Sequence, residues 1–220
     1  MKKAIGILLW SAIALAALLG IAGTAAWWNV WAFLAFMGVT GAATHRLIQN
    51  APGLAEERRT AAAQAPHWDV NVVRMVNLAL PVMLVVAALD MRFRWFPPVS
   101  AAVSMAALAA MIPAAMLTYR AMAANLFFSS HVHIQQDRGH VVVSTGPYRL
   151  IRHPGYTGAV LFNLLAPLAL GAWAAWVPGI GTALLLIFRT AREDRFLMAE
   201  LPGYSAYAAK VPHRLAPGIW

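Results

Sequence analysis

Cysteine is absent from this sequence, and charged residues are scarce. None of the 220 residues is Cys, which excludes disulfide bonds, thiolate metal sites and a cysteine nucleophile. Only 11% of the residues are charged, whereas 61% are hydrophobic, and the mean hydropathy is +0.63. A soluble domain of this length needs more charge to cover its surface, so the composition indicates a protein whose solvent is the lipid bilayer.

Acidic residues and phosphate-binding glycine motifs are also in short supply. The chain has 8 Asp and Glu against 17 Lys and Arg, an excess that is typical of nucleic-acid-binding proteins. Here the basic residues lie in short segments between apolar runs, so we expect no nucleic-acid partner. No Gly-x-Gly-x-x-Gly or Walker motif occurs, which excludes a hidden soluble Rossmann domain.

Long apolar runs dominate the sequence. A helix needs ~20 residues to cross the ~30 Å of hydrocarbon in a bilayer. Six runs are candidate spans, namely 4–22, 27–44, 70–89, 96–117, 156–176 and 177–188. The last run is short, so we expect its helix to enter at a slant and to continue in water to about Leu201, where Pro202-Gly203 ends it. We predict an all-α polytopic membrane helical bundle of about six transmembrane helices.

The first run also has the features of a signal peptide, with Ala26 near a plausible cleavage point, but its length favours a retained helix. Threading six spans from a cytoplasmic N-terminus places fifteen of the 17 Lys and Arg residues in the cytoplasm and leaves Arg92 and Arg94 outside. This distribution follows the positive-inside rule. We expect a multi-pass protein of a bacterial inner membrane, with both termini and the polar segments facing the cytoplasm.

The chain divides into an N-terminal four-helix transmembrane region, residues 1–118, and a C-terminal region, residues 119–220. Residues 45–68 are expected to form a polar loop, and residues 119–134 an amphipathic or half-buried helix. Residues 135–154 are punctuated by glycine and proline, which is typical of a loop.

Polar residues concentrate in that loop and just beyond the last apolar run. His153 precedes a proline, so it is disfavoured in a helix and is expected at an extended elbow before the fifth span. Arg152 beside it can pair with a carboxylate. Arg189 and Glu193 are four residues apart and share one face of a helix, where a solvated ion pair is the simpler interpretation.

Several side chains offer atoms that could bind a metal ion, namely His131, His133, His140, His153 and Asp137. The His-x-His spacing suits one side of an extended strand. In the helix expected over residues 119–134 these two side chains point in different directions, so we predict no metal site.

Three motifs in the C-terminal region resemble those of the isoprenylcysteine carboxyl methyltransferase family and its phospholipid-methyltransferase relatives. The first is Gly146-Pro147-Tyr148 followed by Arg152-His153-Pro154-x-Tyr156-x-Gly158. After an apolar hairpin come Arg189-x-x-x-Glu193-Asp194 and Tyr204-x-x-Tyr207, where the family has Arg-x-x-x-Glu-Glu and Tyr-x-x-Tyr. The resemblance covers residues 135–220. Asp194 in place of the second Glu, and Leu201-Pro202-Gly203 in place of an aromatic–glycine pair, are departures from the family pattern.

The resemblance implies a membrane enzyme that uses S-adenosylmethionine. Its cofactor pocket would be lined by Gln135, His140, Val141, Val142, Val143, Tyr148, His153, Pro154, Gly155, Tyr156 and Glu193. The catalytic candidates are Arg189, Arg152 and Asp194. Arg189 would orient the carboxylate or phosphate of the acceptor, and His153 or Asp194 would take a proton if the acceptor is an amine or a thiol.

The reaction that the resemblance favours is carboxyl O-methylation of an isoprenylcysteine-like or other lipophilic substrate. Phospholipid N-methylation and thiol S-methylation are alternatives. The expected partners are a lipophilic small molecule or lipidated substrate and membrane lipids, and the sequence leaves the oligomeric state open. A transporter would need polar groups at mid-bilayer depth, where only Asn77 and Asn163 lie; a structural membrane subunit is the other non-enzymatic alternative.

Overall fold

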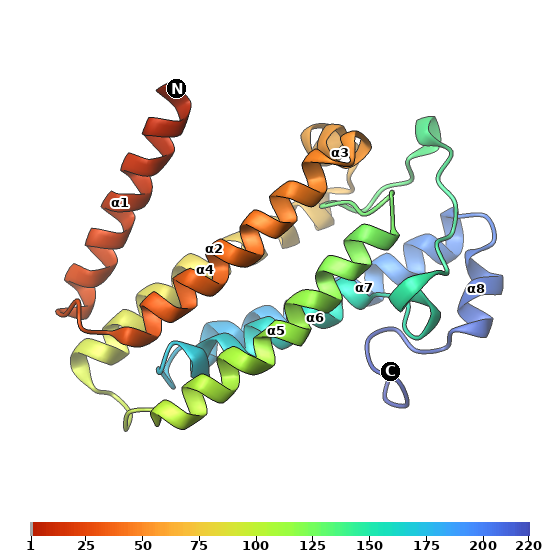
Figure 1. The fold of residues 1–220 in the computed structure, drawn as a ribbon. Helices are drawn as coiled ribbons and strands as arrows, with labels where there is room; N and C mark the ends of the chain where they lie inside the picture. The colour runs from red at the N-terminus through yellow and green to blue at the C-terminus, as the bar shows by residue number, and fades with distance from the viewer. Residues whose placement is uncertain (1) are drawn as a thin grey trace.

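A computed structural model describes the backbone of residues 2–220, and their side chains except those of residues 2–5, 7, 8, 52, 55 and 59. Within this part the regular secondary structure is entirely helical, without strands (Figure 1). The elements are α1 (Lys2–Ala22), α2 (Trp28–Gln49), α3 (Pro52–Gln64), α4 (His67–Phe93), α5 (Ala101–Ala124), the 3₁₀ turns η1 (Gln136–Arg138) and η2 (Gly146–Arg149), α6 (Pro154–Ala169), α7 (Trp176–Glu200) and α8 (Tyr204–Lys210).

Two of these helices, α4 and α5, are long and apolar enough to cross a bilayer. They are 27 and 24 residues long, and many of their large apolar side chains remain exposed, as expected where lipid is the solvent. The described chain therefore has the character of a helical membrane protein. The six-span threading and the side on which the termini lie remain predictions.

Close contacts between helices depend on glycine. A Cβ atom on Gly158 of α6 would lie 2.1 Å from Thr118 Oγ1 and 2.5 Å from Ala114 O of α5. A Cβ on Gly179 of α7 would lie 2.6 Å from Asn163 O of α6. Small residues at such points let helix backbones approach closely, which is how helices associate in membranes. These glycines hold α6 between α5 and α7.

Buried hydrogen bonds fix the far end of α6, where the helix gives way to a turn. Trp27 Nε1 donates to Leu170 O at 2.9 Å, and Asn29 Nδ2 donates to Ala169 O at 3.1 Å. Asp90 of α4 accepts a hydrogen bond from Ala174 N at 3.1 Å. The first two contacts satisfy carbonyls that the helix end leaves without partners, and the third satisfies an N–H group of the turn that follows.

Three sequence-based assignments are wrong. The run 156–176, predicted as one span, is helical only to Ala169, and Gly171 with φ 76° then turns the chain. Residues 45–68, predicted as a loop, contain α3, which begins at Pro52, and proline suits the first turn because its missing N–H has no helical partner there. Residues 119–134, predicted as a helix, are helical only to Ala124. Asn125 ends α5 with its side chain, since Oδ1 accepts a hydrogen bond from Phe127 N at 2.8 Å in place of a helical carbonyl.

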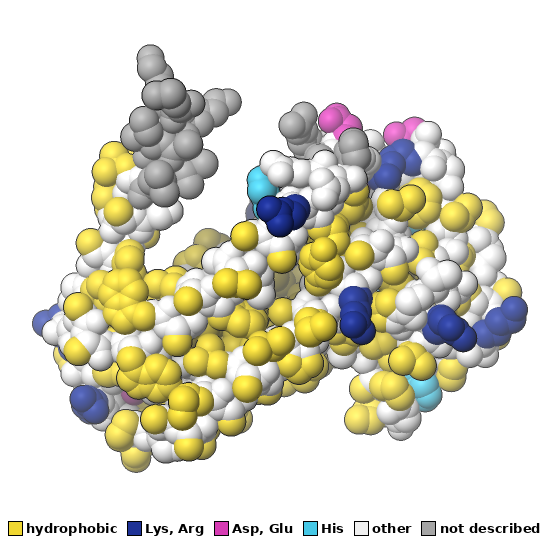
Figure 2. Space-filling view, in the orientation of Figure 1, with side chains coloured by type: hydrophobic (Ala, Val, Ile, Leu, Met, Phe, Trp, Pro, Cys, Tyr) yellow, Lys and Arg dark blue, Asp and Glu magenta, His cyan; other side chains and the backbone are white. Residues whose placement is uncertain are grey.

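The polar segments gather at one end of the molecule. In Figure 1 the loop between α5 and α6, the C-terminal end of α7, α8 and the chain terminus lie together at the right. In Figure 2 hydrophobic side chains cover much of the helical face, and Lys and Arg side chains concentrate toward that same end. The helix α7 runs on to Glu200 before the turn at Pro202-Gly203, which confirms the predicted extension of the last apolar run.

Candidate active site

The polar end is organised around the elbow that precedes α6. His153 has φ −127° and ψ 60°, and Pro154 is the first residue of the helix, which confirms the predicted elbow. The N–H groups of Arg152 and His153 donate to His213 O and Arg214 O, both at 2.9 Å. The C-terminal tail therefore supplies the backbone partners that the elbow lacks.

Asp194 of α7 joins the elbow to the rest of this end. Its Oδ1 accepts hydrogen bonds from Arg152 Nε at 2.7 Å, His153 Nε2 at 3.1 Å and Tyr204 OH at 2.9 Å. Its Oδ2 accepts from Arg152 Nη2 at 2.9 Å and Arg214 Nε at 2.8 Å. Burial alone would raise the pKa of Asp194, but these hydrogen bonds outweigh burial and hold the pKa far below its usual range. The carboxylate is thus a fixed anion that ties the elbow, α8 and the tail to α7.

A cavity of about 320 Å³ opens beside this ion cluster. Eleven of the residues expected at the site line it, namely His140, Val141, Val142, Val143, Tyr148, Arg152, His153, Gly155, Tyr156, Arg189 and Glu193. Three others lie behind its wall, namely Gln135, Pro154 and Asp194. Gln135 supports the wall, since its Nε2 donates to Phe127 O at 3.0 Å.

Aromatic side chains line one end of the cavity. His140 stacks on Phe127 with ring centroids 4.5 Å apart, and Asn125 Nδ2 lies 3.3 Å from Tyr148 OH. Tyr207 OH donates to Tyr148 O at 2.7 Å. Burial raises the pKa of both tyrosines, to about 12 for Tyr207, so both phenols remain protonated. Burial also lowers the pKa of His140 to about 4, with His133 and Arg138 adding to the effect.

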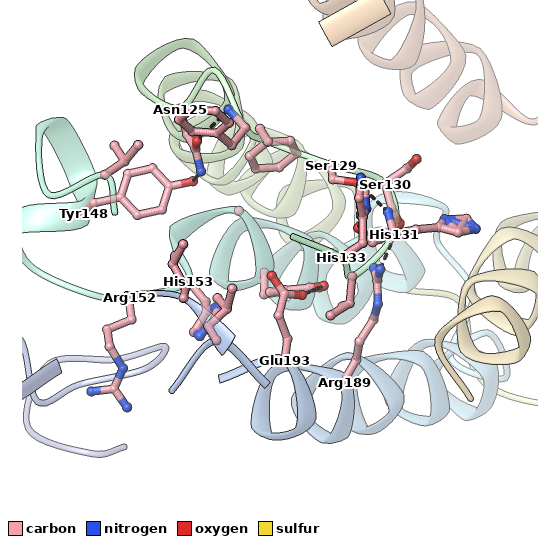
Figure 3. A pocket seen from close by; sticks show the side chains of 18 of the residues that line it. Asn125, Ser129, Ser130, His131, His133, Tyr148, Arg152, His153, Arg189 and Glu193 are labelled. Atoms are coloured by element: carbon pink, nitrogen blue, oxygen red, sulfur yellow. Dashed lines mark hydrogen bonds between the residues drawn. The ribbon is translucent and has the colours of Figure 1, made fainter. Parts of the chain in front are cut away.

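Glu193 lies between the two ends of the cavity, as Figure 3 shows, with Tyr148 and His153 on one side and His131 and Arg189 on the other. Its Oε2 accepts a hydrogen bond from Tyr156 OH. Both residues were expected at the site, although they are 37 positions apart in the sequence.

Arg189 lies at the inner end of the cavity, where a partner from α4 holds it. Arg189 Nε donates to Asp69 Oδ1 at 2.7 Å and Nη2 to Asp69 Oδ2 at 3.2 Å. Arg189 Nη2 also donates to Ser130 O at 2.8 Å, and its guanidinium lies 5.4 Å from the ring centroid of Tyr156. Asp69 is fully buried and accepts a further hydrogen bond from Val132 N at 2.9 Å.

Several residues at this site were missed by sequence reasoning. Asp69 and Glu57 belong to the N-terminal region, where no motif marked them, and Asp69 alone carried a weak signal as a single acid in the first turn of an apolar helix. Ser129 Oγ bonds to the Glu57 carboxylate and accepts from His131 N at 2.9 Å, which attaches α3 to the loop over the cavity. The tyrosines of α8, Tyr204 and Tyr207, were noted as a motif but given no role.

The histidines weighed as metal ligands have separate surroundings. His153 pairs with Asp194, and His140 stacks on Phe127. In the part of the chain that the structure describes, no three His, Cys, Asp or Glu side chains are arranged as a metal site would require.

Comparison with known proteins gives two findings. Residues 105–199 match the model of the isoprenylcysteine carboxyl methyltransferase (ICMT) family, which confirms the resemblance seen in the motifs. This segment runs from α5 into the last turns of α7 and contains the elbow, Arg189 and Glu193. A stretch of 86 residues is 34% identical to the cobalt-zinc-cadmium resistance protein CzcN of Cupriavidus metallidurans, covering 37% of this chain and 38% of that relative. The match therefore spans less than half of the relative's length.

Proposed function

Residues 105–199 match the isoprenylcysteine carboxyl methyltransferase family, and on that premise we propose that this chain transfers a methyl group from S-adenosylmethionine to a lipophilic acceptor at the membrane. The observation that carries the proposal is the closure of one cavity by the elbow and by the carboxylate-bearing turn of α7. His153 contacts Asp194, and Tyr156 bonds to the neighbouring Glu193. Neither segment forms a pocket by itself.

The residues present fit the proposed methyl donor. The cavity volume of about 320 Å³ falls in the range of ~300–1,000 Å³ that is typical of small-molecule sites. Phe127 and Tyr148 offer aromatic faces to a purine or to a sulfonium cation. Glu193 offers a carboxylate to ribose hydroxyls or to an ammonium group. When bound, S-adenosylmethionine supplies an activated methyl group, and the protein has to align it with the acceptor at ~3–3.5 Å.

A path for a lipophilic acceptor is also present. An apolar groove of about 990 Å³ lies between α2, α5 and α6. Thr118 and Ala159 line both this groove and the cavity, so the two spaces share a wall. A hydrocarbon chain in the groove would place its head group near the inner end of the cavity, while the donor would enter from the polar end.

The family name describes carboxyl methylation, and the resemblance favours an isoprenylcysteine-like carboxyl acceptor. Phospholipid amines and thiols are the alternatives. All three reactions use the same donor and a lipophilic acceptor, and this shared reaction is what we propose. The orientation that fits it places the polar end in the cytoplasm, where S-adenosylmethionine is made available.

Titration of the purified protein with S-adenosylmethionine by isothermal calorimetry tests the proposal. We expect binding by the wild type and at least tenfold weaker binding by Glu193→Ala, because hydrogen bonds to charged groups contribute about 1.5–3 kcal/mol. Glu200→Ala is the matched control, since Glu200 is an exposed acid of the same helix outside the cavity. Unchanged binding by a folded Glu193→Ala protein would refute the assignment of Glu193, and the absence of binding by the wild type would refute the proposed function.

A further inference from the structure

Both arginines that line the cavity are already paired with carboxylates. Asp194 holds Arg152 and Asp69 holds Arg189, each through two nitrogen atoms. A guanidinium captures a carboxylate through two parallel N–H groups. The Nε–Nη2 edge of Arg189 is occupied by Asp69, and Nη2 also bonds to Ser130 O, so this edge is not open to a substrate carboxylate.

Asp69 cannot easily release Arg189. Its side chain is fully buried, and it also anchors the loop over the cavity through Val132 N at 2.9 Å. Turning Asp69 away would break a buried ion pair and leave a buried charge without its partner, which is strongly destabilising. Asp69 lies outside residues 105–199, so the family match does not include the residue that neutralises Arg189.

A second polar pair, His133 and Glu57, lies at the same end. His133 lines the cavity and is 9% exposed. Its Nδ1 lies 3.2 Å from His131 O, and since a carbonyl can only accept, this contact assigns the donor role to Nδ1 and leaves Nε2 as the proton acceptor of the neutral ring. Glu57 Oε1 lies 4.0 Å from Nε2, and Glu57 Oε2 has no hydrogen-bond partner among the described atoms.

We infer that the methyl acceptor presents a nucleophilic atom that carries a proton (an amine, thiol or hydroxyl on a lipophilic chain) and that His133 removes this proton. The inference rests on the function proposed above and names its substrate class. Asp69 is then a specificity-determining residue, because it occupies the Nε–Nη2 edge through which Arg189 would hold a carboxylate acceptor by two parallel hydrogen bonds.

The atoms and charges of the step balance. The lone pair of the acceptor atom forms a bond to the methyl carbon while the carbon–sulfur bond of S-adenosylmethionine breaks, and that electron pair stays on sulfur as a neutral thioether. The proton of the acceptor passes to His133 Nε2. The resulting imidazolium is balanced by Glu57, and His133 also lies close enough to His131 and His140 to influence both of them electrostatically.

Four lipids with one common chain provide the test, namely dodecylamine, dodecanethiol, dodecanol and dodecanoate. Full-length protein in detergent is first titrated with S-adenosylmethionine and is then assayed with a methyl-tritiated donor and each lipid. We expect at least one of the three protic lipids to be labelled at least tenfold faster than dodecanoate. Calorimetry without the donor should show weaker binding of dodecanoate than of dodecanol.

The variant His133→Gln should slow labelling of the protic lipid by at least about tenfold and flatten its pH profile, with donor affinity unchanged. His67→Gln changes an exposed histidine at the start of α4, and this control should leave the labelling rate, the pH profile and the donor affinity unchanged.

Three outcomes would each overturn the inference. They are labelling of dodecanoate as fast as the protic lipids, labelling of none of the four lipids by protein that binds the donor, and full activity of His133→Gln. In each of these outcomes intact donor binding leaves the methyl-donor site of the proposed function standing, whereas wild-type protein that does not bind the donor overturns both.

Discussion

His153 and Asp194 illustrate, at the scale of single residues, how a side chain acquires its role from its surroundings. Sequence reasoning gave Asp194 a possible part in proton transfer. In the structure five hydrogen bonds occupy its two oxygen atoms, and these bonds lower its pKa. A carboxylate held in this way is a poor base. Its proximity to the elbow instead explains how Arg152 and His153 are kept in place.

The pKa of His140 leads to a prediction about pH. Because the folded protein lowers this pKa from 6.5 to about 4, His140 stays neutral in the folded state where it is protonated in the unfolded state. Between about pH 6.5 and 4 the unfolded chain binds more protons, so this contribution to stability is complete above pH 6.5 and is lost as the pH falls. His140 Nδ1 also accepts a hydrogen bond from Gln135 N at 3.3 Å, which a proton on Nδ1 would break.

We expect the apparent melting temperature of the wild type to fall more between pH 7.5 and pH 5 than that of His140→Gln. His140 is only half-buried, so solvent screening limits the difference, which we expect to be roughly 2–4 °C, the response to about 1 kcal/mol in a chain of this size. Melting of both proteins in the same detergent at the two pH values measures it. Equal losses in the two proteins would show that His140 does not contribute.

At the scale of elements, the contact between α5 and α6 determines where the cavity can form. Gly158 lies two residues after Tyr156, and a Cβ atom at Gly158 would overlap Ala114 O and Thr118 Oγ1. Thr118 Oγ1 also lies 3.4 Å from Gly155 O, at the start of α6. A separation of the two helices at this point would shift the elbow relative to α7.

The substitution Gly158→Ala should therefore destabilise the protein by about 1–3 kcal/mol, as overpacking does, and weaken donor binding. Gly181→Ala is the matched control, since Gly181 lies within α7 and a Cβ there meets no atom within 4 Å. Thermal melting and donor titration of the two variants compare them. If Gly158→Ala melts at or above the temperature of Gly181→Ala, close packing at this contact is not required.

The helices themselves could largely be predicted from the sequence, but the ends of α5 and α6 and the existence of α3 could not. Runs of apolar residues locate α4 and α5 because a bilayer-length helix needs about 20 of them, and the shorter run 177–188 locates the first half of α7. The end of α5 at Ala124 depends on Asn125 bonding to the chain beyond it, where no proline or glycine marks a stop. The helix α3 was missed because its sequence is polar on most sides, and only packing shows that Leu54, Glu57 and Ala61 form one buried face.

For the whole molecule, the charge distribution predicts the orientation in the membrane. The loop between α4 and α5 carries Arg94 at one end of the molecule, and α8 lies at the other (Figure 1). Because the chain has no cysteine, single cysteines introduced by mutation report their own accessibility.

We expect Phe96→Cys, in the exposed loop between α4 and α5, to react with a membrane-impermeant maleimide in intact bacterial cells expressing the protein. Ser205→Cys, exposed on α8, should react only after the cells are permeabilised. The reverse pattern would contradict the cytoplasmic position of the cavity, and labelling of both in intact cells would show that the two loops lie on the same side.

The sequence by itself indicated that lipid surrounds the protein, and it located most of the helices and the elbow. Hydropathy, helix length and the restriction before proline are local properties of the chain. The same local motifs pointed to the family and to most of the residues that line the cavity. Only the tertiary structure decided which charged side chains form ion pairs. Arg152 and Asp194 are 42 positions apart, and Arg189 and Asp69 are 120 apart. Such pairs depend on how α4 and α6 pack against α7, and through them the fold determines which arginines remain available to a substrate.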